Sequence, residues 1–482
     1  MIFNSIQFAL FLPIVFLLYW FVFDKWIAKS KHQLRLQNAF VLVASYVFYG
    51  WWDWKFLILI AFTSLCSYLS GILMREGDKR RNLTVMWVNI VINIAILGMF
   101  KYYDFFATEF ARLFGLQSDK LLLHLILPVG ISFYTFQALS YSIDIYRQKM
   151  QPTRDAVAFF AYIAFFPQLV AGPIERATNL LPQFLRRREF DYQTALDGAR
   201  QILWGLFKKM VVADTCASYV DMAFGAPAAG SVKLMGAIFF TFQIYGDFSG
   251  YSDIAIGTAK LFGVKLMRNF ANPYFSRDIA EFWRRWHMSL TTWFRDYIYI
   301  PLGGSRCAKW KVIRNTFIIY LVSGFWHGAN WTFIAWGLFH ACLFVPLIAT
   351  GKNRKYTDVV AAGRWLPSAK ELGQMTLTFM LAVIGWVFFR ATGIPSAIGY
   401  FKSMLSVDTL TGFYQLFTAK AWPMNLYIAV MLLVEWLNRG REHGLDLRGI
   451  RPGWLRWAVY YLLVAAVLLF GAESSNFIYF QF

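Results

Sequence analysis

Long apolar runs recur along the whole chain, and they restrict its fold more than any other feature. A helix needs about 20 apolar residues to cross a bilayer, and many of these runs approach that length. We expect roughly ten to thirteen membrane helices, with the shorter runs re-entrant or buried. The clear candidates are about 6–23, 38–52, 56–74, 83–100, 155–172, 233–250, 326–349, 372–391, 424–438 and 454–472. Less clear are about 121–146, 198–217, 252–266 and 311–324.

The composition agrees with a membrane domain. Of the 482 residues, 58% are hydrophobic and 15% are charged, whereas a soluble domain carries about 25% charged residues. The predicted fold class is an all-α polytopic membrane protein. We expect one domain over 1–482, with a motif-bearing region at about 120–350 and C-terminal helices at about 370–482. The first apolar run is expected to be a span rather than a removed signal peptide.

Positive charge is concentrated between the apolar runs. The net charge is +20, and basic residues in short loops are typical of the cytoplasmic side of a membrane protein, so nucleic acid is not an expected partner. Basic loops at 25–35 and 75–81 enclose two apolar runs, which places the N-terminus outside the cytoplasm. The four cysteines are scattered and form no CxxC pair, so neither a disulfide framework nor a metal site is expected.

A histidine interrupts the apolar region around 323–331. His327 lies between Gly324 and Gly328, whose spacing of four allows a neighbouring helix to approach closely. Desolvation at such a contact disfavours the imidazolium ion, and a neutral imidazole can act as a general base. His327 is therefore the predicted catalytic residue. The alternative is a packing histidine that is hydrogen-bonded across helices.

A second histidine lies in the segment Glu281–Ile298. Wound as one helix, this segment is amphipathic, with an aromatic stripe opposite its charged residues, and we expect it to lie at a membrane interface. His287 falls at the edge of the aromatic arc and is the second predicted catalytic residue; the alternative is a structural histidine. The predicted substrate-binding residues beside the two histidines are Trp286, Ser289, Arg295, Asp296, Trp326 and Asn330.

Two carboxylates stand in the apolar stretch Tyr245–Asp253. Polar residues within membrane segments are costly and are usually functional, so Asp247 and Asp253 are also predicted to contribute to substrate binding. Gly246 and Gly250 suggest a broken helix here. Alternatively, the two carboxylates lie in an interfacial loop and cap a helix, or they hold the local fold.

Ordered blocks over nearly the whole chain resemble the membrane-bound O-acyltransferase (MBOAT) family, most closely its bacterial branch that O-acetylates alginate and related polymers. The resemblance is weaker after about residue 350. The blocks are Met1–Ser5, Ala44–Tyr49, Lys101–Tyr103, Leu127–Gln137, Asp144 with Tyr146, Phe166–Pro173, Asp247–Asp253, Trp286–Leu290, Arg295–Tyr297, Pro301–Gly304 and Phe325–Gly328.

The resemblance implies about 11 transmembrane helices, with re-entrant or interfacial helices, around a central tunnel. It maps the family's catalytic histidine onto His327 and its second functional histidine onto His287, which would orient the thioester or help to stabilise the oxyanion. It also implies a multi-pass protein of the bacterial inner membrane, in contact with lipid.

The same resemblance implies that the protein is an enzyme that transfers an acyl group. The group, typically acetyl, would pass from a cytoplasmic thioester such as acetyl-coenzyme A or an acyl carrier protein towards an extracytoplasmic polysaccharide. An SGNH-like acetyltransferase partner would often complete the transfer. No permanently bound cofactor and no metal are expected.

Two other functions remain open at the level of sequence. A polysaccharide or lipid transporter could use the same polar interior, although no internal repeat supports an inverted-repeat transporter. A non-catalytic membrane scaffold would only recruit a partner enzyme. No HxxxxD, GxSxG, P-loop, GxGxxG or HExxH motif is present, so a covalent serine or cysteine mechanism has no motif behind it.

Overall fold

The computed structural model describes residues 1–170, 172–225, 227–412, 418, 421–472, 477 and 478. The chain is 71% helical, and the described residues contain no strand. The prediction of an all-α fold is confirmed.

The chain forms two compact units. One contains residues 1–199 and 255–267, and the other contains residues 200–254 and 268–482. The chain passes from one unit to the other within α11 (Tyr192–Leu206) and within α13 (Gly230–Leu261). The single domain over 1–482 stays a prediction.

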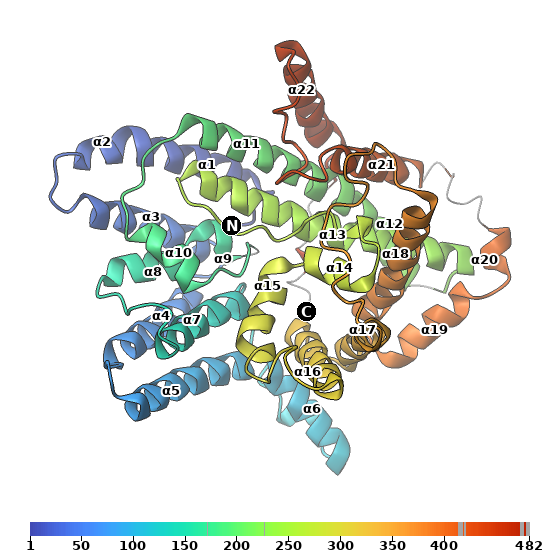
Figure 1. Ribbon diagram of the computed structural model, residues 1–482, viewed down its shortest axis with the longest axis horizontal. Helices are drawn as coiled ribbons and strands as arrows, with labels where there is room; N and C mark the ends of the chain where they lie inside the picture. Colours follow the sequence, from blue (N-terminus) through green and yellow to red (C-terminus); the bar gives the residue numbers. More distant parts are fainter. Residues whose placement is uncertain (171, 226, 413–417, 419–420, 473–476, 479–482) are drawn as a thin grey trace. The chain divides into compact units, whose positions relative to one another are not determined.

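The first unit contains the N-terminal helices (Figure 1). Polar side chains start several of them, because a helix leaves its first N–H groups without partners; Ser5 and Asp78 cap the first and fifth helices in this way. The elements are α1 (Ile6–Leu17), the π-helix Leu18–Phe23, α2 (Asp24–Ile27), α3 (Gln33–Gly50), α4 (Lys55–Leu73), α5 (Lys79–Leu97), the π-helix Gly98–Tyr102, α6 (Tyr103–Phe114), the 3-10 turn Ser118–Lys120, α7 (Ile131–Tyr146), α8 (Ala156–Ala164), α9 (Phe166–Leu169) and α10 (Ala177–Phe184).

A polar cluster lies inside this first unit, where α7 packs against α4 and α5. The side chain of Asn89 donates to the hydroxyl of Ser142, which is 2.5 Å from the hydroxyl of Ser70. All three side chains are buried. Since such bonds between helices hold membrane bundles together, we interpret this cluster as structural.

The second unit contains the histidine-bearing helices. After α11 its elements are the π-helix η4 (Phe207–Ala213), α12 (Asp214–Gly225), α13, the 3-10 turn Pro273–Phe275, α14 (Ile279–Arg285), α15 (Met288–Phe294), the π-helix η6 (Arg295–Tyr299), α16 (Lys309–His327), α17 (Trp331–Ala349), α18 (Ala369–Arg390), α19 (Ile394–Met404), α20 (Asp408–Thr411), α21 (Trp422–Leu437) and α22 (Gly453–Phe470).

Helices α16 and α17 form a closely packed hairpin in this unit (Figure 1). A Cβ atom on Gly324 would overlap the carbonyl oxygen of Phe333, and one on Gly337 would overlap that of Tyr320. The two backbones can therefore touch only because both positions lack a side chain. Large aromatic side chains, including Trp286, Trp336 and Trp386, fill the core beside this hairpin.

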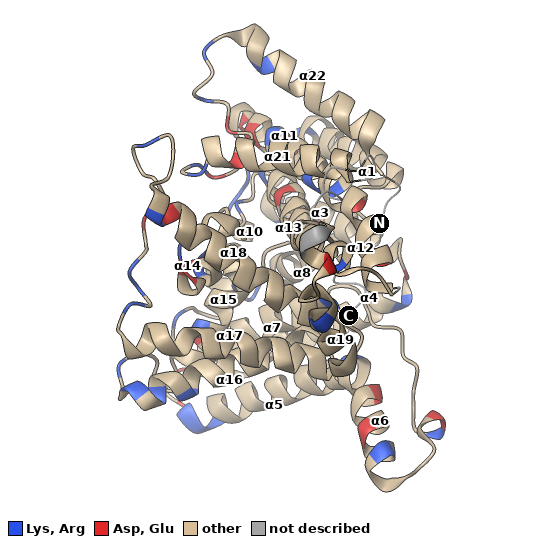
Figure 2. Ribbon diagram, turned by 90° about the vertical axis from the view of Figure 1, so that its right-hand side faces the viewer, with Lys and Arg blue, Asp and Glu red and all other residues tan. Residues whose placement is uncertain are grey.

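Six helical stretches are long and apolar enough to cross a membrane, counted over the described residues. They are Ile6–Ile27, Lys55–Leu73, Lys79–Phe114, Trp331–Ala349, Ala369–Arg390 and Gly453–Phe470. In Figure 2 the shafts of α5, α16 and α17 are largely free of charged residues, and Lys and Arg lie towards their ends. The count of about 11 spans stays a prediction.

Two predicted boundaries were wrong. The run 326–349 is not one helix, because the extended backbone of Gly328 and the cap at Asn330 separate α16 from α17. Conversely, the runs 233–250 and 252–266 belong largely to the single helix α13. Gly246 and Gly250 do not break it. They let α11 and η4 approach, since a Cβ on Gly246 would lie 2.9 Å from the carbonyl oxygen of Lys208 in η4, and one on Gly250 would lie 2.8 Å from that of Gly205 in α11.

Candidate active site

His327 is the last residue of α16 and is 4% exposed. Its ring centroid lies 4.9 Å from that of Trp326, 5.1 Å from Trp336 and 5.2 Å from Phe389. The extended backbone of Gly328 ends the helix immediately after it. An aromatic enclosure of this kind keeps bulk water from the imidazole.

His287 lies at the junction of α14 and α15 and is 1% exposed. Its backbone is left-handed, with φ 43° and ψ 54°, a conformation that costs energy in a residue other than glycine and that clusters at functional sites. Burial lowers the pKa of His287 to about 3, so the ring is neutral at physiological pH.

The two histidines lie next to each other. Their ring centroids are 6.5 Å apart, and the Trp326 ring lies 6.1 Å from His287. The sequence placed His287 and His327 forty residues apart without indicating that they meet, and the structure brings them together.

The prediction of one amphipathic helix over 281–298 was wrong. The segment breaks at His287 and turns into a π-helix at Arg295. Glu281 was expected on an exposed polar face, but its side chain is buried between the guanidinium groups of Arg277, at 3.0 Å, and Arg285, at 2.9 Å. These two arginines satisfy the carboxylate, which allows it to be buried.

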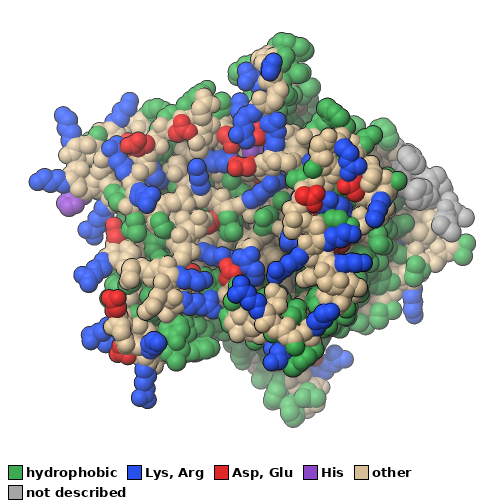
Figure 3. Space-filling view, in the orientation of Figure 1, with side chains coloured by type: hydrophobic (Ala, Val, Ile, Leu, Met, Phe, Trp, Pro, Cys, Tyr) green, Lys and Arg blue, Asp and Glu red, His purple; other side chains and the backbone are tan. Residues whose placement is uncertain are grey.

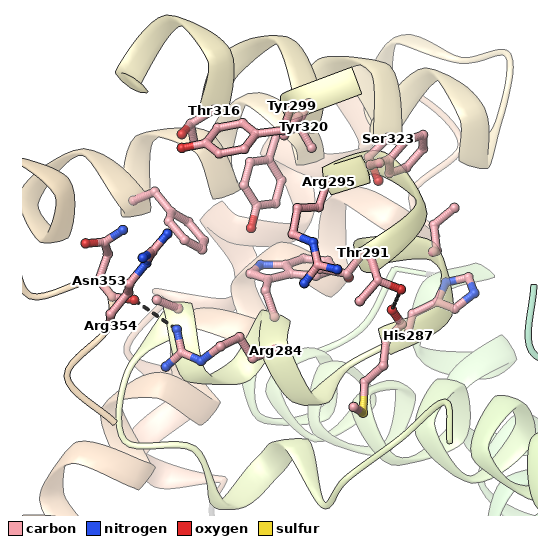
Figure 4. A pocket seen from close by; sticks show the side chains of 18 of the residues that line it. Arg284, His287, Thr291, Arg295, Tyr299, Thr316, Tyr320, Ser323, Asn353 and Arg354 are labelled. Carbon is pink, nitrogen blue, oxygen red and sulfur yellow. Dashed lines mark hydrogen bonds between the residues drawn. The ribbon is translucent and has the colours of Figure 1, made fainter. Parts of the chain in front are cut away.

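A cavity of about 600 Å³ opens beside His287. In Figure 4 the guanidinium groups of Arg284 and Arg354 lie on the opposite side of the cavity from the His287 ring. Arg295 lies between this arginine end and His287. Tyr320 and Ser323 of α16 contribute to its wall. One cavity therefore combines a buried neutral imidazole with a cationic end that suits phosphate or carboxylate groups.

The cationic end is held by hydrogen bonds to two loops. The guanidinium of Arg284 donates to the carbonyl oxygens of Asn353, at 2.9 Å, and Tyr356, at 2.6 Å, and that of Arg354 donates to the hydroxyl of Ser305. Arg295 forms an ion pair with Asp296 at 2.7 Å. Lys and Arg side chains are also numerous on the face of the molecule that Figure 3 shows.

Of the ten predicted site residues, His287 and Arg295 line this cavity. The buried Trp286 packs on Trp386 at 4.8 Å. The hydroxyl of Ser289 donates to the side-chain oxygen of Asn269, and the side-chain oxygen of Asn330 accepts from the backbone N–H of Thr332, so both positions hold the local fold.

Asp247 and Asp253 lie within α13 and form buried ion pairs. Lys209 is 2.7 Å from Asp247, and Lys208 is 2.6 Å from Asp253. Asp247 also accepts from the backbone N–H of Ile478 at 2.7 Å. The interfacial-loop interpretation was wrong, and these contacts support the alternative in which the two carboxylates hold the local fold.

Sequence reasoning missed Lys208 and Lys209, which face α13 from η4. Two adjacent lysines inside the apolar run 198–217 were a usable signal, because charged residues within membrane segments are paired or functional. It also missed the contact of the Phe477 ring with Phe248, at 5.8 Å; the Phe248 ring in turn lies 4.6 Å from that of His287.

No group of three or more histidine, cysteine or acidic side chains is placed to hold a metal ion in the part of the chain that the structure describes.

Comparison with known proteins identifies the family to which the chain belongs. The model of the membrane-bound O-acyltransferase family matches residues 153–356, which contain both histidines. The protein of Pseudomonas aeruginosa named "Probable alginate O-acetylase AlgI" is 40% identical over 417 residues, which cover 85% of this chain and 76% of that protein. The chain belongs to the membrane-bound O-acyltransferase family.

Other members of the family are also similar to the chain. The "Peptidoglycan O-acetyltransferase" of Helicobacter pylori is 32% identical over 533 residues, which cover 100% of this chain and 98% of that protein. The "Teichoic acid D-alanyltransferase" of Bacillus subtilis is 28% identical over 283 residues, which cover 55% of this chain and 69% of that protein. As a member of this family, the chain is a multi-pass membrane protein and an O-acyltransferase of the acetyltransferase type.

Proposed function

We propose that this O-acyltransferase takes an acetyl group from a cytoplasmic thioester, acetyl-coenzyme A in the simplest case, and passes it towards an extracytoplasmic polysaccharide. The acceptor class follows the names of the relatives, which refer to alginate and peptidoglycan. An extracytoplasmic SGNH-like partner protein would complete the transfer. The location would be the bacterial inner membrane.

The observation that carries the proposal is the pairing of His287 with His327 at 6.5 Å, beside a cavity that three arginines line. The phosphate groups of the donor would bind Arg284, Arg295 and Arg354, since guanidinium groups suit phosphate. The thioester would then extend towards the histidines.

In this mechanism His327 is the general base. It takes the proton of an acceptor hydroxyl as that oxygen attacks the thioester carbonyl, and it returns the proton to the leaving thiolate. His287 orients the thioester and stays neutral, as its lowered pKa of about 3 allows. The acyl group passes directly to the acceptor, and no acyl-enzyme forms.

The test is the release of free thiol from acetyl-coenzyme A by the protein in nanodiscs. Replacing His327→Ala should lower turnover by at least about 10²-fold, the usual contribution of general-base catalysis. His287→Ala should lower it as well, whereas His32→Ala, at an exposed position, should leave it unchanged.

Turnover that persists in His327→Ala would refute the assignment of the base. If the isolated native protein releases no thiol, the assay is repeated in membranes with a candidate extracytoplasmic partner. Transport of intact polysaccharide without thiol release, in either setting, would favour a transporter.

A further inference from the structure

Two buried ring nitrogens on α17 have no hydrogen-bond partner among the described residues. They are Nε1 of Trp336 and Nε2 of His340, which lie one helical turn apart, and both residues are 0% exposed. Buried polar atoms in folded proteins are nearly always hydrogen-bonded. These two exceptions are adjacent to each other and to His327, which makes them candidates for binding a ligand.

Both nitrogens are donors. The indole N–H of Trp283 donates to Nδ1 of His340 at 3.3 Å. An indole can only donate, so Nδ1 carries no proton, the imidazole is neutral and its hydrogen is on Nε2. Nε2 faces Gly385, where a Cβ would come within 2.7 Å of it, so only glycine at that position lets the imidazole lie there without a side chain against Nε2.

The two donors lie next to the proposed base. The Trp336 ring centroid is 5.1 Å from that of His327 and 5.0 Å from that of His340. Neutral, fixed N–H donors in a dry site are the groups that stabilise an oxygen as it gains negative charge, because they need no reorganisation during the reaction.

We propose that Trp336 Nε1–H and His340 Nε2–H bind the carbonyl oxygen of the acyl group and stabilise the oxyanion, an inference that rests on the proposed function. The acceptor hydroxyl oxygen bonds to the carbonyl carbon, its proton moves to His327, and the C=O electron pair moves onto the oxygen. The carbonyl then re-forms, the C–S bond breaks, and the thiolate takes the proton from His327.

The first test needs binding but no turnover. Acetyl-coenzyme A labelled with ¹³C at the carbonyl is bound to His327→Ala protein, and its C=O stretch is measured by infrared difference spectroscopy. Hydrogen bonding should shift the band to lower frequency than in solution, and adding Trp336→Phe should reverse much of that shift. Trp204→Phe is the matched control, since Trp204 is also fully buried with an unpartnered Nε1 and stacks on Phe207 instead.

The second test is kinetic, in protein with His327 intact. Loss of one oxyanion donor should lower kcat by about 10²-fold, while KM for the donor stays unchanged. Replacing Trp336 by β-(3-benzothienyl)alanine, which keeps the shape of indole without its N–H, should have the same effect and protects the test against misfolding of Trp336→Phe.

A C=O band and a kcat that match those of Trp204→Phe in both Trp336 variants would overturn the inference and leave the role of His327 intact. Continued thiol release by His327→Ala would instead overturn the assignment of His327 as the base in the proposed function.

Discussion

Arg354 is the residue that most directly tests the cationic end of the cavity. Arg354→Gln removes one guanidinium group from this end, and a lost charge-assisted hydrogen bond of about 1.5–3 kcal/mol should raise KM for acetyl-coenzyme A at least about tenfold. The value of kcat should not change, because Arg354 lies on the opposite side of the cavity from His287 (Figure 4).

Arg451→Gln is the control, since Arg451 is exposed and does not line the cavity. Steady-state kinetics at two salt concentrations measure both effects. Equal KM values for the two variants would contradict phosphate binding by Arg354.

Glu175 should make stability depend on pH. This carboxyl, in the segment between α9 and α10, is 1% exposed, and burial raises its pKa from 4.5 to about 7. The folded state therefore holds the proton more tightly than the unfolded state. The resulting stabilisation is complete below pH 4.5 and is lost as pH rises to about 7, a loss on the order of 3 kcal/mol.

Glu175→Gln, which mimics the protonated carboxyl, should remove this dependence. The thermal midpoint in detergent, measured between pH 4.5 and 8, should fall less in the variant than in the native protein. Parallel curves for the two proteins would show that Glu175 does not titrate in this range.

Single residues were predictable where their chemistry is unusual for their surroundings. His327 and His287 were identified because polar rings in apolar segments are rare. Trp336 and His340 were not identified, because a buried tryptophan is ordinary. That their ring N–H groups lack an acceptor among the described residues depends on which side chains meet in three dimensions. The role of Asp247 was not predictable for the same reason, because its ion-pair partner Lys209 lies thirty-eight residues earlier in the chain.

At the scale of helices, the close approach of α11 and α13 at Gly205 and Gly250 gives a further prediction. Gly250→Ala would place a methyl group 2.8 Å from the carbonyl oxygen of Gly205, and overpacking of this kind costs about 1–3 kcal/mol. Gly373→Ala, on α18 with no atom within 4 Å, should be neutral or slightly stabilising.

Thermal unfolding of the two variants in the same detergent measures the difference. A Gly250→Ala protein as stable as the Gly373→Ala protein would show that the two helices can move apart without loss of stability.

Helix existence was easier to predict than helix breaks. Apolar runs located α4, α5, α17, α18 and α22, because burial in lipid selects for length and hydropathy. The breaks at His287 and Gly328 carry no proline, and the glycines of α13 suggested a break that is absent. In each case packing against a neighbouring element, which no local pattern shows, decided the outcome.

At the scale of the whole molecule, the basic loops predict which end of α4 faces the cytoplasm. In a protein whose four cysteines are replaced by serine, Lys55→Cys should react with a membrane-impermeant maleimide in spheroplasts, because it starts α4 on the outer side. Lys79→Cys, at the start of α5 and beyond the inner end of α4, should react only after permeabilisation. Both lysines are exposed, so accessibility in the folded chain is matched.

Labelling of both cysteines in intact spheroplasts would contradict a membrane crossing by α4. The reversed pattern would place the N-terminus in the cytoplasm.

The π-helix η4 has a consequence for the effect of mutations on this protein. A π-helical turn is an α-helical turn with one residue inserted, and here the turn holds Lys208 and Lys209 against two carboxylates of α13. An in-frame loss of a single codon within 207–213 would leave a good helix but rotate everything before it by about 100°. We expect such a deletion to be as damaging as the loss of His327, although it alters no residue of the proposed active site.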